Sequence, residues 1–162
     1  MSDLRSYSTV YPNVQKGEVE PTGGYVEVHV THCDHEAQRN IDTAVILAKA
    51  GFKVRLLMID DTPYTKNPDA YFFNERVYVE FKHSFTPTRS AIEHAVRAGR
   101  KQADYLLLHV LSSIDKVTLL KGLKNRMYFA DNVRGLWLIW REQLYFFERG
   151  EIFDGTIDLK IQ

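Results

Sequence analysis

The feature that most constrains the fold is a run of six residues, Tyr105–Val110 (YLLLHV), in which nearly every side chain is apolar. A strand of this kind has no polar face to turn toward water, so it is typical of the centre of a sheet that is covered on both faces. Helices are the usual cover for such a sheet. The run therefore predicts an α/β fold with a central sheet flanked by helices.

Three segments have signals for helices that could cover this sheet. Residues 34–50 carry alanine, isoleucine and valine at helical intervals, begin with an acidic capping residue and end before Gly51, which suits a left-handed C-terminal cap. A second helix is predicted to begin at Ser90, because Glu93 stands three residues later, as in a capping box. A third is predicted from Ser112 onward.

Runs of β-branched and aromatic residues predict further strands. They cover residues 25–30, 53–60, 70–73, 77–81, 135–140 and 144–148. The last two of these strands are predicted to form a closing hairpin. Between residues 34 and 110 the predicted order is therefore αβββαβ, with a mixed central sheet, followed by a C-terminal helix and hairpin.

Composition limits the class of protein. The 162 residues are 44% hydrophobic and 26% charged, which fits one globular domain, and the mostly polar residues 1–24 predict an N-terminal arm before a single domain of residues 25–162. Formal net charge is zero, so a nucleic-acid partner would have to meet a local basic patch. A signal-peptide pattern and a membrane-length apolar stretch are both missing, which predicts a cytoplasmic protein with no membrane partner.

One group of charged residues lies where it could perform chemistry. Asp69 precedes one predicted strand, and Glu80, Phe81 and Lys82 end the next. Side chains alternate along a strand, so Glu80 and Lys82 share a face, and hairpin pairing of the two strands would bring Asp69 beside them. Two adjacent carboxylates disfavour each other's ionisation, whereas a divalent cation between them favours it. Hard oxygens suit Mg²⁺ or Mn²⁺, with the carbonyl of Phe81 as a further ligand. Lys82 can position the attacking water or neutralise charge on a phosphate.

This arrangement resembles a known nuclease signature. Residues 67–69 (NPD), followed after ten residues by residues 80–82 (EFK), resemble the motif of the PD-(D/E)xK, or restriction-endonuclease-like, superfamily, and αβββαβ is the core of that superfamily. The resemblance implies a metal-dependent nuclease that cleaves DNA or RNA, with Glu36 on the first helix supporting the metal directly or through water. The implied catalytic core is Asp69, Glu80 and Lys82.

A closer likeness is to the C-terminal nuclease domains of bacterial contact-dependent inhibition and related polymorphic toxins, over roughly residues 34–110. It rests on Glu36 and Asn40, on the small residues leading to Gly51, and on a basic helix that runs into Gln102. A toxin domain would be delivered to the cytoplasm of a target cell and would have an immunity protein as partner. The implied substrate-binding residues are Asn40, Arg97, Arg100, Lys101 and Gln102.

The acidic and basic residues of the motif also have other interpretations. Glu80 and Lys82 can be a solvated ion pair on one face of an edge strand, with Asp69 capping a turn. The fold can also belong to a catalytically inactive protein that serves as a nucleic-acid-binding or assembly module. A site that is no longer used can lose its costly buried charges, so the intact set of three favours the catalytic interpretation.

Two other clusters carry weaker signals. Donor atoms of zinc type crowd into seven residues, but their spacing fits no zinc motif: His29, His32, Cys33 and His35. The aromatic residues of the last hairpin favour core packing over base stacking: Trp137, Trp140, Tyr145, Phe146 and Phe147. A hairpin that is apolar on both sides can also bury one face against a second copy, which would give a homodimer.

Overall fold

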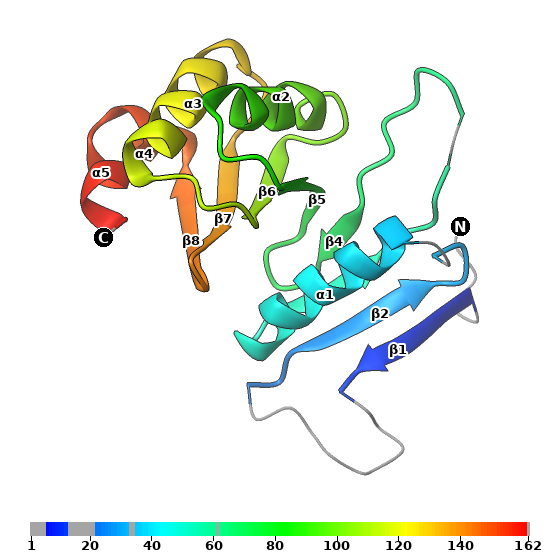
Figure 1. Ribbon diagram of the computed structural model, residues 1–162. Coiled ribbons are helices and arrows are strands. Elements are labelled where there is room, and N and C mark those ends of the chain that lie inside the picture. The colour runs from blue at the N-terminus through cyan, green and yellow to red at the C-terminus, as the bar shows by residue number, and fades with distance from the viewer. Residues whose placement is uncertain (1–5, 13–21, 33–34, 61, 162) are drawn as a thin grey trace. The chain divides into compact units, whose positions relative to one another are not determined.

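The computed structural model describes residues 6–12, 22–32, 35–60 and 62–161, with only the backbone described for His35 and Glu36. The chain divides into two compact units, Met1–Tyr78 and Val79–Gln162. Both units combine strands with helices, so the predicted α/β class is confirmed (Figure 1). None of the helices in the described ranges has the length and apolarity that a membrane crossing requires.

The first unit contains a four-stranded mixed sheet. Its strands are β1 (Tyr7–Tyr11), β2 (Tyr25–His29), β3 (Lys53–Leu56) and β4 (Ala70–Phe72). β2 lies antiparallel to β1 and parallel to β3, and β4 pairs antiparallel with β3. The parallel pair requires a crossover connection, which α1 (His35–Lys49) supplies.

The helix α1 buries one face of this sheet. Its small and apolar residues Ala44, Leu47 and Ala48 are fully buried, and so are the strand residues Val26 and Val54, which are register partners. The approach is close at Gly24, where a Cβ atom would lie 1.8 Å from the carbonyl oxygen of Ala48. Gly24 therefore has to lack a side chain for the chain to enter β2 beneath the helix.

The second unit contains the other strands. They are β5 (Val77–Ser84), whose first two residues belong to the first unit, β6 (Tyr105–Val110), β7 (Gly135–Trp140) and β8 (Gln143–Glu148). β6 lies parallel to both β5 and β7, and β8 pairs antiparallel with β7 as the predicted closing hairpin. Every residue of β6 except the first is buried, as predicted for a strand inside a sheet.

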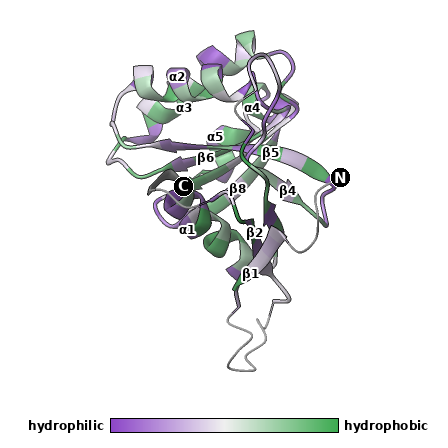
Figure 2. Cartoon of the chain, turned by 90° about the vertical axis from the view of Figure 1, so that its right-hand side faces the viewer, coloured by the Kyte–Doolittle hydropathy of each residue, from purple (hydrophilic) through white to green (hydrophobic). Residues whose placement is uncertain are grey.

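Helices cover one face of the strands in the second unit. They are α2 (Arg89–Gly99), α3 (Lys116–Phe129), α4 (Arg149–Phe153) and α5 (Thr156–Lys160). One core cluster joins apolar residues of these helices to alternate strand residues such as Leu106, Leu108 and Trp140. Both α2 and α3 mix hydrophilic and hydrophobic residues in Figure 2, as expected for helices with one face in the core.

The order α1, β3, β4, β5, α2, β6 is the predicted αβββαβ, but two predicted helix starts were wrong. The cap of α2 is Thr88, whose hydroxyl accepts from the N–H of Ala91, and the cap of α3 is Asp115, whose carboxylate accepts from the N–H of Thr118. Glu93 does not form the predicted capping box, because its carboxylate accepts hydrogen bonds from Arg89 and Asn125 instead. In each case several capping residues lie close together in the sequence, and tertiary contacts select one.

Several other elements also differ from prediction, and the strand predicted over residues 77–81 runs on to Ser84 in β5. The predicted N-terminal arm contains β1, which pairs with β2. The strand predicted over residues 53–60 ends at Leu56, and the next apolar residues, Met58 and Ile59, are exposed. The short helices α4 and α5 were not predicted, because five residues are too few to show a helical period.

Candidate active site

The strand β5 places Glu80 and Lys82 on the same face, two residues apart. The Nζ atom of Lys82 lies 3.5 Å from the Oε2 atom of Glu80, with 8% of the Glu80 side chain exposed and 31% of the Lys82 side chain exposed. A solvated ion pair would leave both groups in water, and the burial of Glu80 argues against that interpretation. The carboxylate is therefore held inside the unit and the ammonium reaches toward its surface.

This pair lies on the face of the strands that the helices cover. Glu80 and Lys82 are register partners of Leu106 and Leu108, which both belong to the core beneath α2 and α3. A Cβ atom at Gly99, the last residue of α2, would lie 3.0 Å from Leu106 and 3.5 Å from the Cγ atom of Lys82. The end of α2 thus packs against the stem of Lys82 and limits where its ammonium can go.

The next side chain in the same row of β5 is Ser84, which sequence reasoning did not single out. Ser84 is 4% exposed, and its hydroxyl finds no hydrogen-bond partner in the described part of the chain. A buried hydroxyl usually has a hydrogen-bond partner, so the hydroxyl of Ser84 is suited to bind a water molecule or a ligand oxygen. The signal available in the sequence was its position, two residues beyond Lys82 on a strand.

Asp69 and Asn40 come together in the first unit. Asp69 directly precedes β4, and its carbonyl oxygen accepts from the N–H of Leu57 at 2.9 Å, which fixes its backbone to the end of β3. The Nδ2 atom of Asn40, on α1, lies 3.5 Å from the Oδ1 atom of Asp69, at the long limit for a hydrogen bond. The helix therefore contributes an amide donor beside this carboxylate.

The other predicted metal ligands lie in different parts of the chain. Glu36 lies in the first turn of α1, and its side chain is outside the described residues. Phe81 is buried between Glu80 and Lys82 on β5. Asp69 belongs to the first unit and Glu80 and Lys82 to the second, so their side-by-side placement stays a prediction from the order of the strands.

The predicted basic residues of α2 divide into two kinds. Arg97 and Lys101 are exposed. Arg100 is instead engaged within the unit, donating to Asn132 Oδ1 at 2.9 Å, to the carbonyl oxygen of Phe129 at 2.8 Å and to Asp131 Oδ1 at 3.0 Å. These bonds connect the end of α2 to the end of α3, and they engage the guanidinium of Arg100 with partners inside the unit. Its role in substrate binding stays a prediction.

A further contact holds α2 to α3 and sets the charge of the surface near Arg97. The carboxylate of Glu93 accepts hydrogen bonds from Asn125 and Arg89, and these bonds hold the pKa of Glu93 below its usual value. Glu93 is therefore ionised at neutral pH and offsets part of the positive charge. Gln102 follows α2, and its N–H donates to the carbonyl oxygen of Gly99 at 3.0 Å.

The donor chemistry of the predicted metal ligands would suit a hard cation. Asp69 and Glu80 offer carboxylate oxygens, and Mg²⁺ is commonly held by one or two carboxylates with water and substrate phosphates completing its shell. Among the residues that the structure describes, no three His, Cys, Asp or Glu side chains gather to hold a metal. A resident ion would therefore need oxygen ligands from water, substrate or undescribed side chains.

The histidine cluster is engaged in local hydrogen bonds. The Nδ1 atom of His29 lies 3.0 Å from the hydroxyl of Thr31, and the Nε2 atom of His32 lies 2.6 Å from the carbonyl oxygen of Leu57. Cys33 and the side chain of His35 lie outside the described residues. These bonds are those of a polar strand end that leads into a helix.

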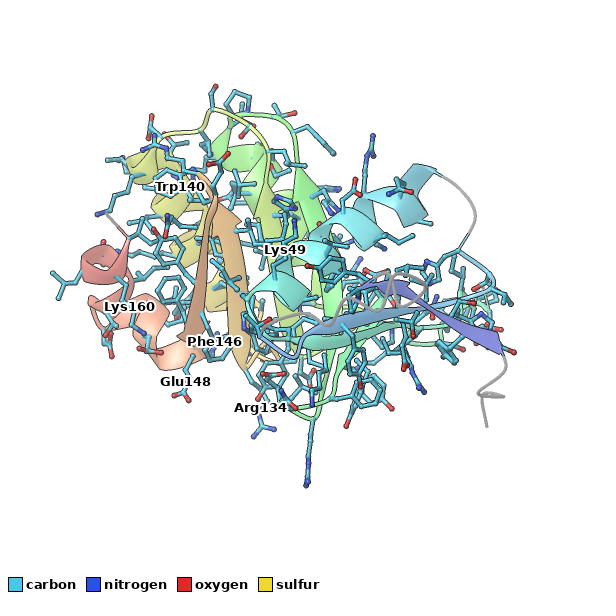
Figure 3. The ribbon with its side chains drawn as sticks, turned by 90° about the horizontal axis from the view of Figure 1, so that it is seen from below. Lys49, Arg134, Trp140, Phe146, Glu148 and Lys160 are labelled. Atoms are coloured by element: carbon cyan, nitrogen blue, oxygen red, sulfur yellow. The ribbon has the colours of Figure 1, made fainter. Side chains whose placement is uncertain are left out.

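The C-terminal aromatic residues pack in the unit, as predicted. Trp140 and Phe147 are buried in the core beneath the helices, whereas the ring of Trp137 lies 4.6 Å from that of Phe146. In Figure 3, Trp140 lies at one end of the β7–β8 hairpin, with Glu148 and Arg134 at the other. A groove of about 590 Å³ lies at that second end, and none of the predicted site residues lines it.

Comparisons with known proteins give one structural likeness. No protein-family model matches the sequence, and no curated protein matches it. The chain is similar to a chain of a solved structure described as "CdiA-CT/CdiI toxin and immunity complex from Burkholderia pseudomallei", with a TM-score of 0.51 and 19% sequence identity. The match covers 69% of this chain and 83% of that chain. At this identity the likeness establishes a shared fold, and activity has to be argued from the site.

Proposed function

We propose that the chain is a metal-dependent nuclease of the PD-(D/E)xK type that acts as a toxin domain. The observation that carries the proposal is the Glu80–Lys82 pair, in which a buried carboxylate lies 3.5 Å from a partly exposed ammonium at the third strand of an αβββαβ sequence of elements. Burying an ion pair contributes little net stability, because desolvation opposes the attraction. A role in chemistry therefore explains the pair better than a role in folding.

The residues of the chain would divide the work between them. Asp69, Glu80 and the carbonyl of Phe81 would hold a Mg²⁺ or Mn²⁺ ion, with Glu36 supporting it. When bound, such an ion polarises a phosphoryl oxygen and makes water a better nucleophile. Lys82, held by its stem against Gly99, would stabilise charge that appears on the phosphate in the transition state. Ser84 could hold a water or a phosphate oxygen in the same row.

The proposed substrate is DNA or RNA. Arg97 and Lys101 are exposed at the end of α2, close in the chain to the contact between Gly99 and Lys82. Cations there would bind phosphates without reading the base sequence. The likeness to a toxin and immunity complex supports delivery into the cytoplasm of a target cell and an immunity protein as partner.

A second candidate is a non-catalytic module that binds a partner, including an immunity-type protein. One observation favours it. The similar structure is described as containing both a toxin and an immunity protein. A chain of this kind would keep its fold and bind its partner but would not turn over a substrate.

Cleavage assays separate the two candidates. Plasmid, single-stranded DNA and total RNA would each be incubated with Mg²⁺, Mn²⁺ or EDTA, using wild type, Asp69→Asn, Glu80→Gln and the matched surface variant Glu93→Gln. The nuclease proposal expects cleavage that requires a divalent ion and disappears in the first two variants only. Cleavage in EDTA, or equal cleavage by Glu80→Gln, would refute the assigned site. No cleavage of any substrate by folded wild type would favour the non-catalytic module.

A further inference from the structure

The first unit has a sheet face that turns away from α1. Along β2, β3 and β4, the residues Val26, Val54 and Phe72 are fully buried register partners on the helix side, so the side chains between them point the other way. This opposite face carries aromatic rings around one ion pair, and we call it the aromatic face. Its members are Tyr7, Tyr25, Glu27, Arg55, Tyr71, Phe73 and Tyr78.

The rings of the aromatic face form a continuous series of contacts. Ring centroids lie 6.0 Å apart between Tyr25 and Phe73, 5.2 Å apart between Phe73 and Tyr71, and 5.1 Å apart between Tyr71 and Tyr78. These distances are those of interacting aromatic pairs. The series runs from β2 to β4 and β5, so it extends along one face of the unit.

A single guanidinium is fixed within the series. The Cζ atom of Arg55 lies 4.3 Å from the ring centroid of Tyr7 and 5.2 Å from that of Phe73. Glu27 accepts from both the Nε and an Nη atom of Arg55, at 2.8 Å and 2.7 Å. The guanidinium plane is thereby held in place, and the carboxylate of Glu27 balances its charge.

The aromatic face is partly open to solvent. Tyr78 is 56% exposed, and the side chains of Arg55 and Glu27 are 19% and 24% exposed. Within the described ranges of the first unit, α1 is the only helix, and it packs on the other face. Burial and the nearby Glu27 raise the pKa of Tyr25, so its hydroxyl is a donor at neutral pH.

The chemistry of this face suits unpaired bases. Every base has a π-face that can stack on tyrosine or on a guanidinium plane, and stacking of this kind tolerates any sequence. A duplex hides those faces between its own base pairs, so only single strands, loops or splayed ends can use such a surface. Because Glu27 balances Arg55, the attraction would come from stacking more than from phosphate charge, with Lys53 of β3 as an additional cation.

We propose that the aromatic face binds the unpaired bases of single-stranded nucleic acid. The inference deepens the proposed function and rests on it for the identity of the polymer, because it states which form of the substrate the chain holds. Single-stranded RNA and single-stranded DNA present the same stacking chemistry, and the experiment separates them.

Fluorescence anisotropy with labelled twelve-nucleotide probes tests the proposal. The probes are one mixed sequence as RNA, as DNA and as a blunt duplex, all in EDTA to prevent cleavage. The variants are Tyr71→Leu, which removes a central ring, and Tyr78→Leu, which removes an exposed one. Tyr128→Leu is the matched control, because Tyr128 is 70% exposed on α3 and lies outside the aromatic face. Circular dichroism checks that each variant is folded.

Wild type is expected to bind at least one single strand roughly tenfold more tightly than the duplex, with each aromatic-face variant weakening that binding roughly tenfold and the control unchanged. Photocrosslinking of a 5-iodouracil probe to wild type, mapped by mass spectrometry, should label peptides that contain Tyr71 or Tyr78. Equal binding of duplex and single strand, no binding by wild type, or both variants within twofold of wild type would overturn the inference.

Cleavage measured separately in Mg²⁺ and Mn²⁺ distinguishes this inference from the proposed function. If wild type cleaves nucleic acid and the aromatic-face variants bind normally, the inference fails and the nuclease proposal stands. If wild type binds single strands through Tyr71 and Tyr78 but never cleaves them, the nuclease proposal fails and the inference stands.

Discussion

Replacing Lys82 by methionine separates the chemistry of its ammonium from the packing of its stem. Methionine keeps an unbranched side chain against Gly99 and removes only the charge that lies 3.5 Å from Glu80. Breaking a fully buried ion pair costs about 3–5 kcal/mol, and an exposed pair contributes about 0–1 kcal/mol. With Glu80 buried and the Lys82 side chain 31% exposed, we expect a loss of about 2 kcal/mol, between these limits.

This loss of stability is too small to explain a loss of activity. For a chain of 162 residues, about 2 kcal/mol lowers Tm by about 4–8 °C. A domain with ordinary stability of about 5–15 kcal/mol would stay almost entirely folded at 25 °C. Removing a group that stabilises the transition state costs on the order of a hundredfold or more in rate. Lys82→Arg should rescue little, because a planar guanidinium does not replace a compact ammonium.

Single-turnover cleavage with saturating enzyme in Mg²⁺ measures the rate, while anisotropy in Ca²⁺ measures substrate binding and urea titration measures stability. Lys121→Met is the matched control, because Lys121 is an exposed lysine on α3 that lies outside the proposed site. We expect Lys82→Met to bind substrate nearly as wild type does and to cut it far more slowly. If it binds much more weakly but cuts bound substrate at the normal rate, Lys82 anchors the substrate and the proposed mechanism is wrong.

Three further changes have expected outcomes. Arg149→Ala should lower the free energy of unfolding by about 3 kcal/mol in urea titration, because its guanidinium donates to four carbonyl oxygens at and after the end of α3, and Arg134→Ala, with an exposed guanidinium, should change it little. Arg97→Ala should reduce the salt slope of nucleic-acid binding by about one, and an unchanged slope would place the phosphate path elsewhere. The bond from Lys124 lowers the pKa of Asp158, so this stabilisation is present above its usual pKa of 3.8 and is lost as pH falls below it. Thermal melts of Asp158→Asn should therefore fall less steeply than wild type below about pH 4, and parallel curves would contradict this.

Periodicity in the sequence located the strands best where the physical signal was strongest. The apolar runs of β6 and β7 match the predicted bounds, because a strand that is buried on both faces has little choice of side chain. The short strand β1 gave no comparable signal, since its middle residues are exposed and its pairing partner lies in β2. Helix starts failed for a related reason: Glu93 binds Asn125 on another helix, and a local pattern cannot show that contact.

The candidate site illustrates the same limit. Alternation along a strand was enough to predict a shared face for Glu80 and Lys82, because the period of two is a property of the backbone. It could not predict that Glu80 would be buried while the Lys82 side chain stays 31% exposed, since burial depends on which segments pack around the strand. Nor could it single out Gly99, which lies close to both Leu106 and the stem of Lys82.

The position of Gly99 also bears on how the site would work. A larger side chain at this position would press on Leu106, which lies 3.0 Å from the position of a Cβ atom there, whereas the Lys82 stem lies at an ordinary contact distance of 3.5 Å. Transition-state stabilisation depends on a charge that is already in place before the reaction begins. A lysine on a flexible stem would have to be ordered during each turnover, at a cost in side-chain entropy. The packing of the stem beside α2 and the 3.5 Å ion pair with Glu80 would meet part of that cost during folding.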